Sequence, residues 1–219
     1  MKVFLFAAFS AFLTAAPVCA QENDSARDVY TAGRDLEASG RITEAENYYN
    51  EAVRICTRLI QSGSATMDTY AVLTWSLQRQ KKYTDVVMWG ERALRIQNDY
   101  RIIETMGEAH FYLKNFPAAL KNMEIYTANM SNGDRASVAY FFIGEIYRIE
   151  RKYRYADIAY TAAVQLEPGM ALWWYRLGTV RESTQDFSYA AEAFKRALKI
   201  NPSYSDALEG LNRLRKVSA

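Results

Sequence analysis

Apolar side chains recur along this chain at intervals of three and four residues, the spacing that gathers them on one face of an α-helix. Segments with this pattern follow one another in pairs and are separated by short polar turns. Only four prolines and ten glycines interrupt the 219 residues, so long helices are easily accommodated. The pattern predicts an all-α protein built from pairs of helices.

The helical pattern itself repeats, because Gly144 and Gly178 are thirty-four residues apart in matching surroundings. The first of the two matching segments contains Tyr140, Ile143, Gly144, Tyr147, Ala156, Tyr160, Ala163 and Pro168. The second contains Trp174, Leu177, Gly178, Ala190, Phe194, Ala197 and Pro202. A period of this length is typical of a solenoid of stacked helix pairs. In each pair, the glycine predicts a point where two helices cross without room for a side chain.

These two segments resemble the tetratricopeptide repeat family at nearly every signature position, and weaker copies precede them. One copy contains Met106 and Gly107, another contains Gly33, and a third has Thr74 where the glycine belongs. A hydrophobic residue also recurs before the second helix of every copy, as Ile42, Tyr83, Phe116, Tyr153 and Phe187. The resemblance implies a right-handed solenoid of about five repeats. We expect them at about 26–59, 67–99, 100–133, 137–170 and 171–204.

The segment after the last repeat, 205–219, predicts a helix that caps the solenoid. Ser205 can cap its first turn, and three leucines share one face while basic residues share the other. The inward residues are Leu208, Leu211 and Leu214, and the outward residues are Arg213, Arg215 and Lys216. A polar-backed helix of this kind closes the open end of a repeat array.

Residues 1–20 have the composition of a secretory signal peptide, with Lys2 followed by an apolar run and by small residues before Gln21. The apolar run would reach about 21 Å as a helix, short of the roughly 30 Å that a membrane span requires. Two alternatives are a membrane anchor and a lipid attached to Cys19, although Pro17 and Val18 fit a lipoprotein signal poorly. We expect cleavage, a short tail at residues 21–25, and export to the periplasm of a bacterium with two membranes.

The composition argues against several classes of function. The 27 basic and 25 acidic side chains nearly balance, so no overall positive field favours nucleic acid. The chain has one histidine and lacks both a glycine-rich phosphate loop and paired cysteines, so we expect no catalytic, cofactor or metal site. His110 is expected in the packed interior, and Cys56 is expected to act as a small apolar side chain rather than an intermolecular bridge.

The resemblance implies a concave face, built by the first helix of each repeat, that holds an extended peptide or a partner's helix. The residues expected to bind the partner there are Tyr30, Arg34, Trp75, Gln78, Arg101, Glu104, Glu108, Phe111, Phe141, Glu145, Arg148, Tyr175 and Glu182. A lysine and asparagine clamp for a C-terminal carboxylate, known in one subfamily, is absent, because Tyr30 and Arg34 stand in its place.

Two features of this face leave alternatives open. Its aromatic row, Trp75, Phe111, Phe141 and Tyr175, could line one groove or pack between repeats. Its acidic cluster, Glu104, Glu108 and Glu145, could be neutralised by Arg101 and Arg148 or by a basic ligand. In the adjacent tryptophan pair we expect Trp174 to be the core anchor and Trp173 to be free, and we expect Tyr140 to be buried.

A basic edge follows the turns inside the repeats and consists of Arg41, Lys81, Lys82, Lys114, Arg151, Lys152 and Arg154. These residues could meet an anionic surface, but they also lie where cations complement helix dipoles, which is the interpretation we favour. The sequence thus predicts an exported scaffold or adaptor for a partner protein or peptide. The alternative is a structural subunit that self-associates into a homo-oligomer.

Overall fold

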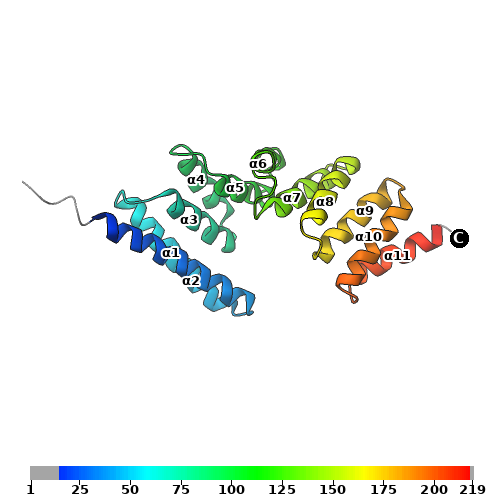
Figure 1. Cartoon of the computed structure of the whole chain (residues 1–219), viewed down its shortest axis with the longest axis horizontal. Coiled ribbons are helices and arrows are strands. Elements are labelled where there is room, and N and C mark those ends of the chain that lie inside the picture. The colour runs from blue at the N-terminus through cyan, green and yellow to red at the C-terminus, as the bar shows by residue number, and fades with distance from the viewer. Residues whose placement is uncertain (1–14, 218–219) are drawn as a thin grey trace, which may run out of the picture. The chain divides into compact units, whose positions relative to one another are not determined.

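The computed structural model describes the backbone of residues 15–217 and the side chains of residues 25–216. The described chain contains eleven α-helices and no strand, which confirms the predicted all-α repeat fold (Figure 1). In order, the helices are α1 (Ala15–Ala38), α2 (Ile42–Gln61), α3 (Met67–Arg79), α4 (Tyr83–Leu94), α5 (Tyr100–Tyr112), α6 (Phe116–Asn129), α7 (Ala136–Ile149), α8 (Tyr153–Leu166), α9 (Ala171–Ser183), α10 (Phe187–Ile200) and α11 (Ser205–Val217).

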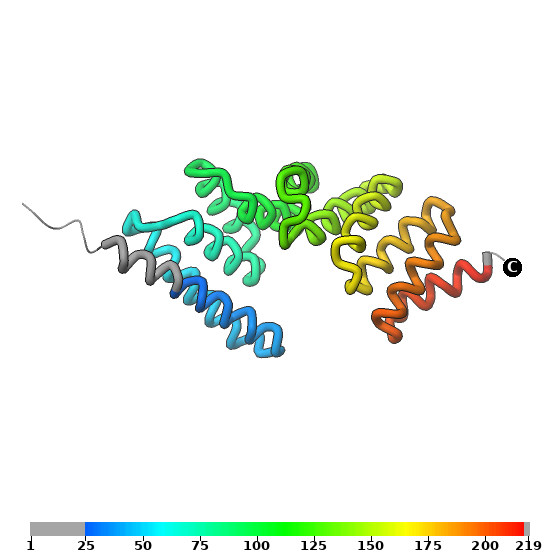
Figure 2. The backbone as a smooth tube through the Cα atoms, viewed as in Figure 1, coloured from blue at the N-terminus to red at the C-terminus, as the bar shows by residue number. Residues whose placement is uncertain are grey.

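The chain divides into two compact units whose boundary falls within α5, between Ile102 and Ile103. In the first unit, α1 packs on α2, α2 on α3 and α3 on α4, and α1 also contacts α3. In the second unit, each helix from α6 to α11 packs on the next, and α9 also contacts α11. Figure 2 shows the backbone of the second unit running back and forth through this stack.

The N-terminal helix begins earlier than the repeat pattern indicates. Most of the expected signal peptide, residues 1–14, lies outside the described residues, and α1 begins at Ala15. Residues 21–25, expected as a short tail, are therefore part of this helix. Export and cleavage remain predictions.

Glycines on the first helices mark the crossings, as the repeat pattern predicts. A Cβ on Gly144 would lie 2.6 Å from the ring of Tyr160 on the paired helix, and one on Gly178 would lie 2.5 Å from Phe194. A Cβ on Gly33 would lie 2.8 Å from the ring of Tyr49, and one on Gly107 would lie 2.9 Å from the side chain of Met123. Distances below about 3 Å leave no room for a methyl group, so each large residue occupies the space that its glycine leaves.

The second repeat exchanges the small and large positions. Thr74 occupies the glycine position on α3 and is fully buried, and its hydroxyl donates to the carbonyl oxygens of Tyr70 and Ala71. Gly90, also buried, occupies the position on α4 where the other repeats carry a large residue. This repeat departs from the sequence signature but keeps one small residue in the pair.

The turn inside every repeat has the same backbone conformation. One residue with positive φ follows the first helix, and these residues are Gly40, Lys81, Lys114, Arg151 and Gln185. In all five turns the amide of the next residue donates to the carbonyl five positions back, as Asn115 does to His110 at 2.9 Å. This geometry is a Schellman cap, in which glycine is the least strained residue. Four of the five repeats therefore use a strained residue at the cap.

We expect Gly144→Leu to lower the free energy of unfolding by about 1 to 3 kcal/mol, because its side chain would overlap the fully buried ring of Tyr160. Gly169→Leu is the matched control, since a Cβ there meets nothing within 4 Å. Urea unfolding followed by circular dichroism measures both. Equal stabilities of the two variants would contradict the crossing.

We expect Lys114→Gly to raise the free energy of unfolding by about 0.5 kcal/mol, because glycine relieves the left-handed backbone but loses more entropy on folding. The same substitution at Lys121, an exposed position inside α6, should lower it by about 1 kcal/mol. Thermal unfolding of both variants gives the two signs. A loss of stability at Lys114 would show that its side chain, not its backbone, decides the cap.

Candidate functional site

The residues expected to bind a partner lie on the first helices of both units, and each unit is described separately. In the first unit, Tyr30 is buried, and its ring contacts Tyr49 and Trp75 with centroids 5.9 and 5.7 Å apart. Trp75 and Gln78 are half-buried, while Arg34 is exposed. Tyr30 thus belongs to the core between α1 and α3, and Arg34 is open to solvent.

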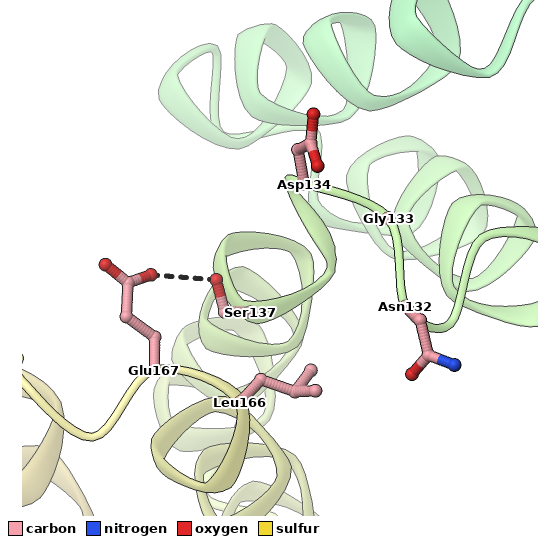
Figure 3. A pocket seen from close by; sticks show the side chains of 6 residues that line it. All are labelled: Asn132, Gly133, Asp134, Ser137, Leu166 and Glu167. Atoms are coloured by element: carbon pink, nitrogen blue, oxygen red, sulfur yellow. Dashed lines mark hydrogen bonds between the residues drawn. The ribbon is translucent and has the colours of Figure 1, made fainter.

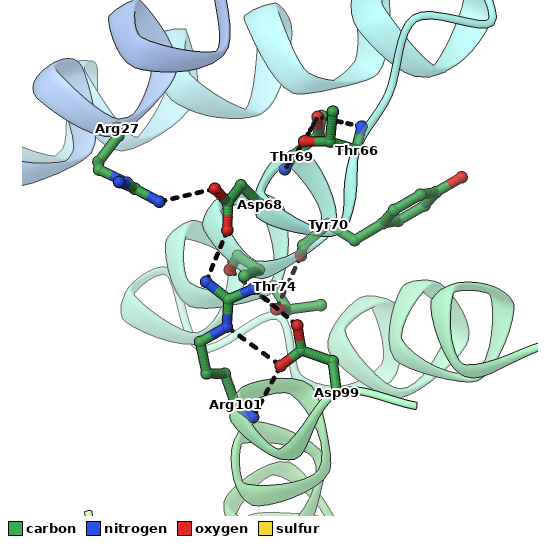
Figure 4. Close-up of polar contacts among 9 residues, drawn as sticks. Arg27, Thr66, Asp68, Thr69, Tyr70, Thr74, Asp99 and Arg101 are labelled. Carbon is green, nitrogen blue, oxygen red and sulfur yellow. Dashed lines mark hydrogen bonds and ion pairs between the residues drawn. The ribbon is translucent and has the colours of Figure 1, made fainter. Parts of the chain in front are cut away.

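A ladder of alternating charges crosses the first helices of this unit (Figure 4). Asp68 on α3 pairs with Arg27 on α1 at 3.0 Å and with Arg101 on α5 at 2.6 Å. Arg101 also binds both carboxylate oxygens of Asp99. The hydrogen bond from Arg101 lowers the pKa of Asp68 below its usual value. Within the first unit, Arg101 thus pairs with two aspartates.

In the second unit, the aromatic row packs between repeats. The ring of Phe141 on α7 stacks on Trp173 of α9, with centroids 5.1 Å apart and planes inclined by 17°. Phe111 packs on Phe142 at 4.9 Å, and Tyr175 packs on Tyr204 at 5.3 Å. These three members of the row are half-buried, so each contributes to packing and keeps part of its surface exposed.

Two expectations about neighbouring aromatics are wrong. Trp173 is the buried member of the tryptophan pair. Trp174 is half-buried, and its ring nitrogen donates to the carbonyl of Pro168 at 2.9 Å. Similarly, the buried neighbour of Phe141 is Phe142, whereas Tyr140 is half-buried. Both exchanges follow from contacts with the preceding repeat, Trp173 with Phe141 and Phe142 with Phe111, which a single repeat's signature does not contain.

The acidic cluster is buried and paired with arginines. Glu104 and Glu108 lie one turn apart on α5, and Arg135, just before α7, contacts both. Its Nε lies 3.1 Å from Glu104, and its Nη2 donates to Glu108. Burial, and then the neighbouring charge of Glu108, hold the pKa of Glu104 well above its ordinary value. The sequence analysis did not name Arg135 as a partner of these two carboxylates.

The third glutamate, Glu145 on α7, is surrounded by three donors. Arg148 binds both of its oxygens, at 3.2 and 2.7 Å, as expected. The Nε of Arg176 on α9 lies 3.1 Å from one oxygen, and the hydroxyl of Tyr160 donates to the same oxygen. Burial and the charge of Glu145 raise the pKa of Tyr160. Arg176 escaped the sequence analysis because it lies between the helix positions assigned to the concave face.

The remaining chemical groups of the second unit are modest. A polar hollow of about 380 Å³ between the loops before α7 and α9 is lined by Asn132, Gly133, Asp134, Ser137, Leu166 and Glu167 (Figure 3). Ser137 donates to Glu167 there at 2.9 Å. His110 is half-buried on α5. Among the described residues, no group of three or more metal-ligating side chains is gathered in one place.

Cys56 is shielded by burial, and parts of the basic edge are paired with glutamates. Cys56 is fully buried, and this burial raises the pKa of its thiol to about 12. On the edge, Arg41 pairs with Glu44, and Lys152 pairs with Glu150 at 2.8 Å. Parts of the edge are thus neutralised within the chain. No helix within residues 15–217 combines the length and apolarity needed to cross a membrane.

Residues 171–204, which form α9, α10 and the turns around them, match the family model of the tetratricopeptide repeat. The same helix pair recurs through the described chain, and in four of the five repeats a glycine on the first helix faces a large residue on the second. The chain has the tetratricopeptide-repeat fold. A search of curated protein sequences gave no match.

Solved structures share the tetratricopeptide-repeat fold over most of the chain. PilF from Pseudomonas aeruginosa is similar with a TM-score of 0.69 and 16% identity, covering 89% of this chain and 85% of that one. Residues 41 to the end of MamA from Desulfovibrio magneticus RS-1 give a TM-score of 0.63 at 19% identity, covering 83% and 97%. YrrB, described as a TPR protein with an unusual peptide-binding site, gives 0.58 at 19% identity, covering 89% and 96%.

The buried pair Glu104 and Glu108 predicts an unusual dependence of stability on pH. Because the folded protein holds the proton of Glu104 more tightly than the unfolded chain does, this carboxyl stabilises the fold at low pH. That contribution is lost as pH rises through the raised pKa. The charged groups that face it are Glu108 and Arg135, with the hydroxyl of Tyr126 nearby.

We therefore expect Glu104→Gln, which mimics the protonated side chain, to gain stability relative to the wild type as pH rises above about 4.3, by up to about 1.4 kcal/mol per pH unit. Glu192→Gln, at an exposed position on α10, is the control and should follow the wild-type curve. Urea unfolding at several pH values measures the differences. Parallel curves for Glu104→Gln and the wild type would mean that Glu104 is ionised throughout.

Proposed function

We propose that this protein is an exported scaffold that holds a partner protein or peptide on the first-helix face of its second unit. We define this face as the side of α5, α7 and α9 that carries the ion-paired glutamates, together with their arginines. The glutamates are Glu104, Glu108, Glu145 and Glu182, and the arginines are Arg135, Arg148, Arg176 and Arg213. The observation that carries the proposal is the combination of half-buried aromatic rings and arginines fixed by ion pairs. Such a surface binds without losing much side-chain freedom.

Other observations support a binding role. The family fold is an open array of helix pairs, and arrays of this kind offer extended surfaces to partners. The similar protein YrrB is described as having a peptide-binding site. The export part of the proposal rests on the composition of residues 1–20 alone.

A second candidate function is self-association through the outer face of α8. Tyr155, Ile158 and Leu166 on this helix are exposed, and their spacing places them on one side of it. Three large apolar side chains on one solvent-facing stripe are more than scattered surface residues. This stripe lies on a second helix of a repeat, so the two candidates can be tested separately.

The test combines Leu172→Glu, at an exposed position on α9, with Ile158→Glu on α8. If the first-helix face binds the partner, Leu172→Glu should lower the amount of partner recovered with the protein from native envelopes by at least about tenfold. Ile158→Glu should leave recovery unchanged. Light scattering after size-exclusion chromatography reports self-association, and intact mass of the native protein reports whether it begins at Gln21.

The opposite outcome favours the second candidate. Oligomers that dissociate in Ile158→Glu, with partner recovery unaffected by Leu172→Glu, would replace the scaffold by a self-associating subunit. Melting curves of both variants should match the wild type because both positions are exposed.

A further inference from the structure

The ion pairs on the first-helix face expose their arginines and bury their carboxylates. The side chain of Arg135 is 46% exposed, whereas that of its partner Glu104 is 4% exposed. Arg148 and Arg176 are 30% and 31% exposed, and the Glu145 that they share is 9% exposed. The face therefore has equal numbers of arginines and glutamates, but the arginine side chains are the more exposed.

The same asymmetry continues at the C-terminal end of the unit. Arg213 on α11 binds Glu182 of α9, and the arginine is again the more exposed partner, 51% against 23%. Each of these ion pairs joins a carboxylate on the first helix of a repeat to a more exposed arginine. The order of the charges in the sequence does not show that the carboxylates are more buried than the arginines.

Arg176 contacts a carboxylate, Glu145, that Arg148 already pairs with. Glu145 already accepts two hydrogen bonds from Arg148 and one from Tyr160. The Nε of Arg176 lies within ion-pair distance of Glu145 but makes no hydrogen bond. Two guanidinium groups thus share one carboxylate, and the surplus positive charge lies beside the ring of Tyr175, 5.7 Å from Arg176.

We infer that the first-helix face of the second unit selects partner segments that carry acidic side chains, with Arg176 as the principal contact. The inference rests on the proposed function and specifies its ligand. A guanidinium group binds a carboxylate through two parallel hydrogen bonds, and the side chain of Arg176 is 31% exposed. Neighbouring Tyr175 and Leu172 provide apolar contact beside that site. A basic ligand was the alternative that the acidic cluster left open, and this inference replaces it by an acidic one.

The choice of variant follows from the same contacts. Arg135 is unsuitable, because removing it would leave two buried carboxylates without their cation. Arg176→Gln leaves Glu145 with Arg148 and Tyr160, so the fold should be retained. Arg196→Gln is the matched control, since Arg196 is exposed on α10, outside this face. Melting curves of both variants should coincide with that of the wild type.

The first experiment is a selection of random phage-displayed peptides on the mature protein. We expect enriched peptides to be rich in aspartate and glutamate. Enrichment of neutral or basic peptides would overturn the inference and leave the proposed function standing. Failure to enrich any peptide would remove the proposed function and the inference with it.

The second experiment measures the affinity of one enriched peptide, labelled with fluorescein, by anisotropy. Replacing its acidic residues by their amides should weaken binding by about tenfold or more, and Arg176→Gln should weaken binding of the acidic form by about threefold to tenfold. Arg196→Gln should not change it, and added salt should weaken the wild-type complex. Equal binding of acidic and amide peptides, or an unchanged affinity in Arg176→Gln, would overturn the assignment.

Discussion

The close approach of the two helices in each repeat is the constraint on which the rest of the structure depends. It requires one residue without a side chain opposite one large residue, as at Gly144 and Tyr160 or at Gly178 and Phe194. The large residue then fills the crossing and is fully buried. The hydroxyl of Tyr160 in turn reaches Glu145 on the first helix of its own repeat. The large residue that fills the crossing thus also donates a hydrogen bond to a buried carboxylate of the same repeat.

Ion pairs between successive repeats complement this packing. Asp68 joins α1 to α5 through two arginines, Glu145 joins α7 to α9 through Arg176, and Glu182 joins α9 to α11 through Arg213. Buried and half-buried pairs of this kind add little net stability, because desolvation offsets much of the attraction. Their geometry is more restrictive than that of apolar contacts. They favour one alignment of neighbouring repeats over others that would bury the same apolar area.

Features set within one repeat could be predicted from the sequence. The period, the glycine crossings and the capping helix follow from residue types at fixed spacings and agree with the structure. One detail of the capping helix is wrong: Leu208, expected to face inward, is 50% exposed, and its neighbour Ala207 is buried. Features set between repeats could not. Arg135 lies in the insertion between the third and fourth repeats, so no periodic position announces its contact with Glu104 and Glu108. Likewise Trp173 and Trp174 are adjacent on one helix, and only the ring of Phe141 in the preceding repeat decides which is buried.

The ring of Phe194 lies between two glycines, Gly178 on α9 and Gly210 on α11, at 2.5 and 2.7 Å from the places their side chains would fill. The capping helix therefore contacts the last repeat much as a further first helix would, and it differs mainly in its polar outer side. A whole repeat can therefore be inserted or removed at this junction without changing the residue types that make the contacts on either side. The length of the first-helix face is thus a property that gene duplication can change in single-repeat steps, while the cap and every existing crossing stay as they are.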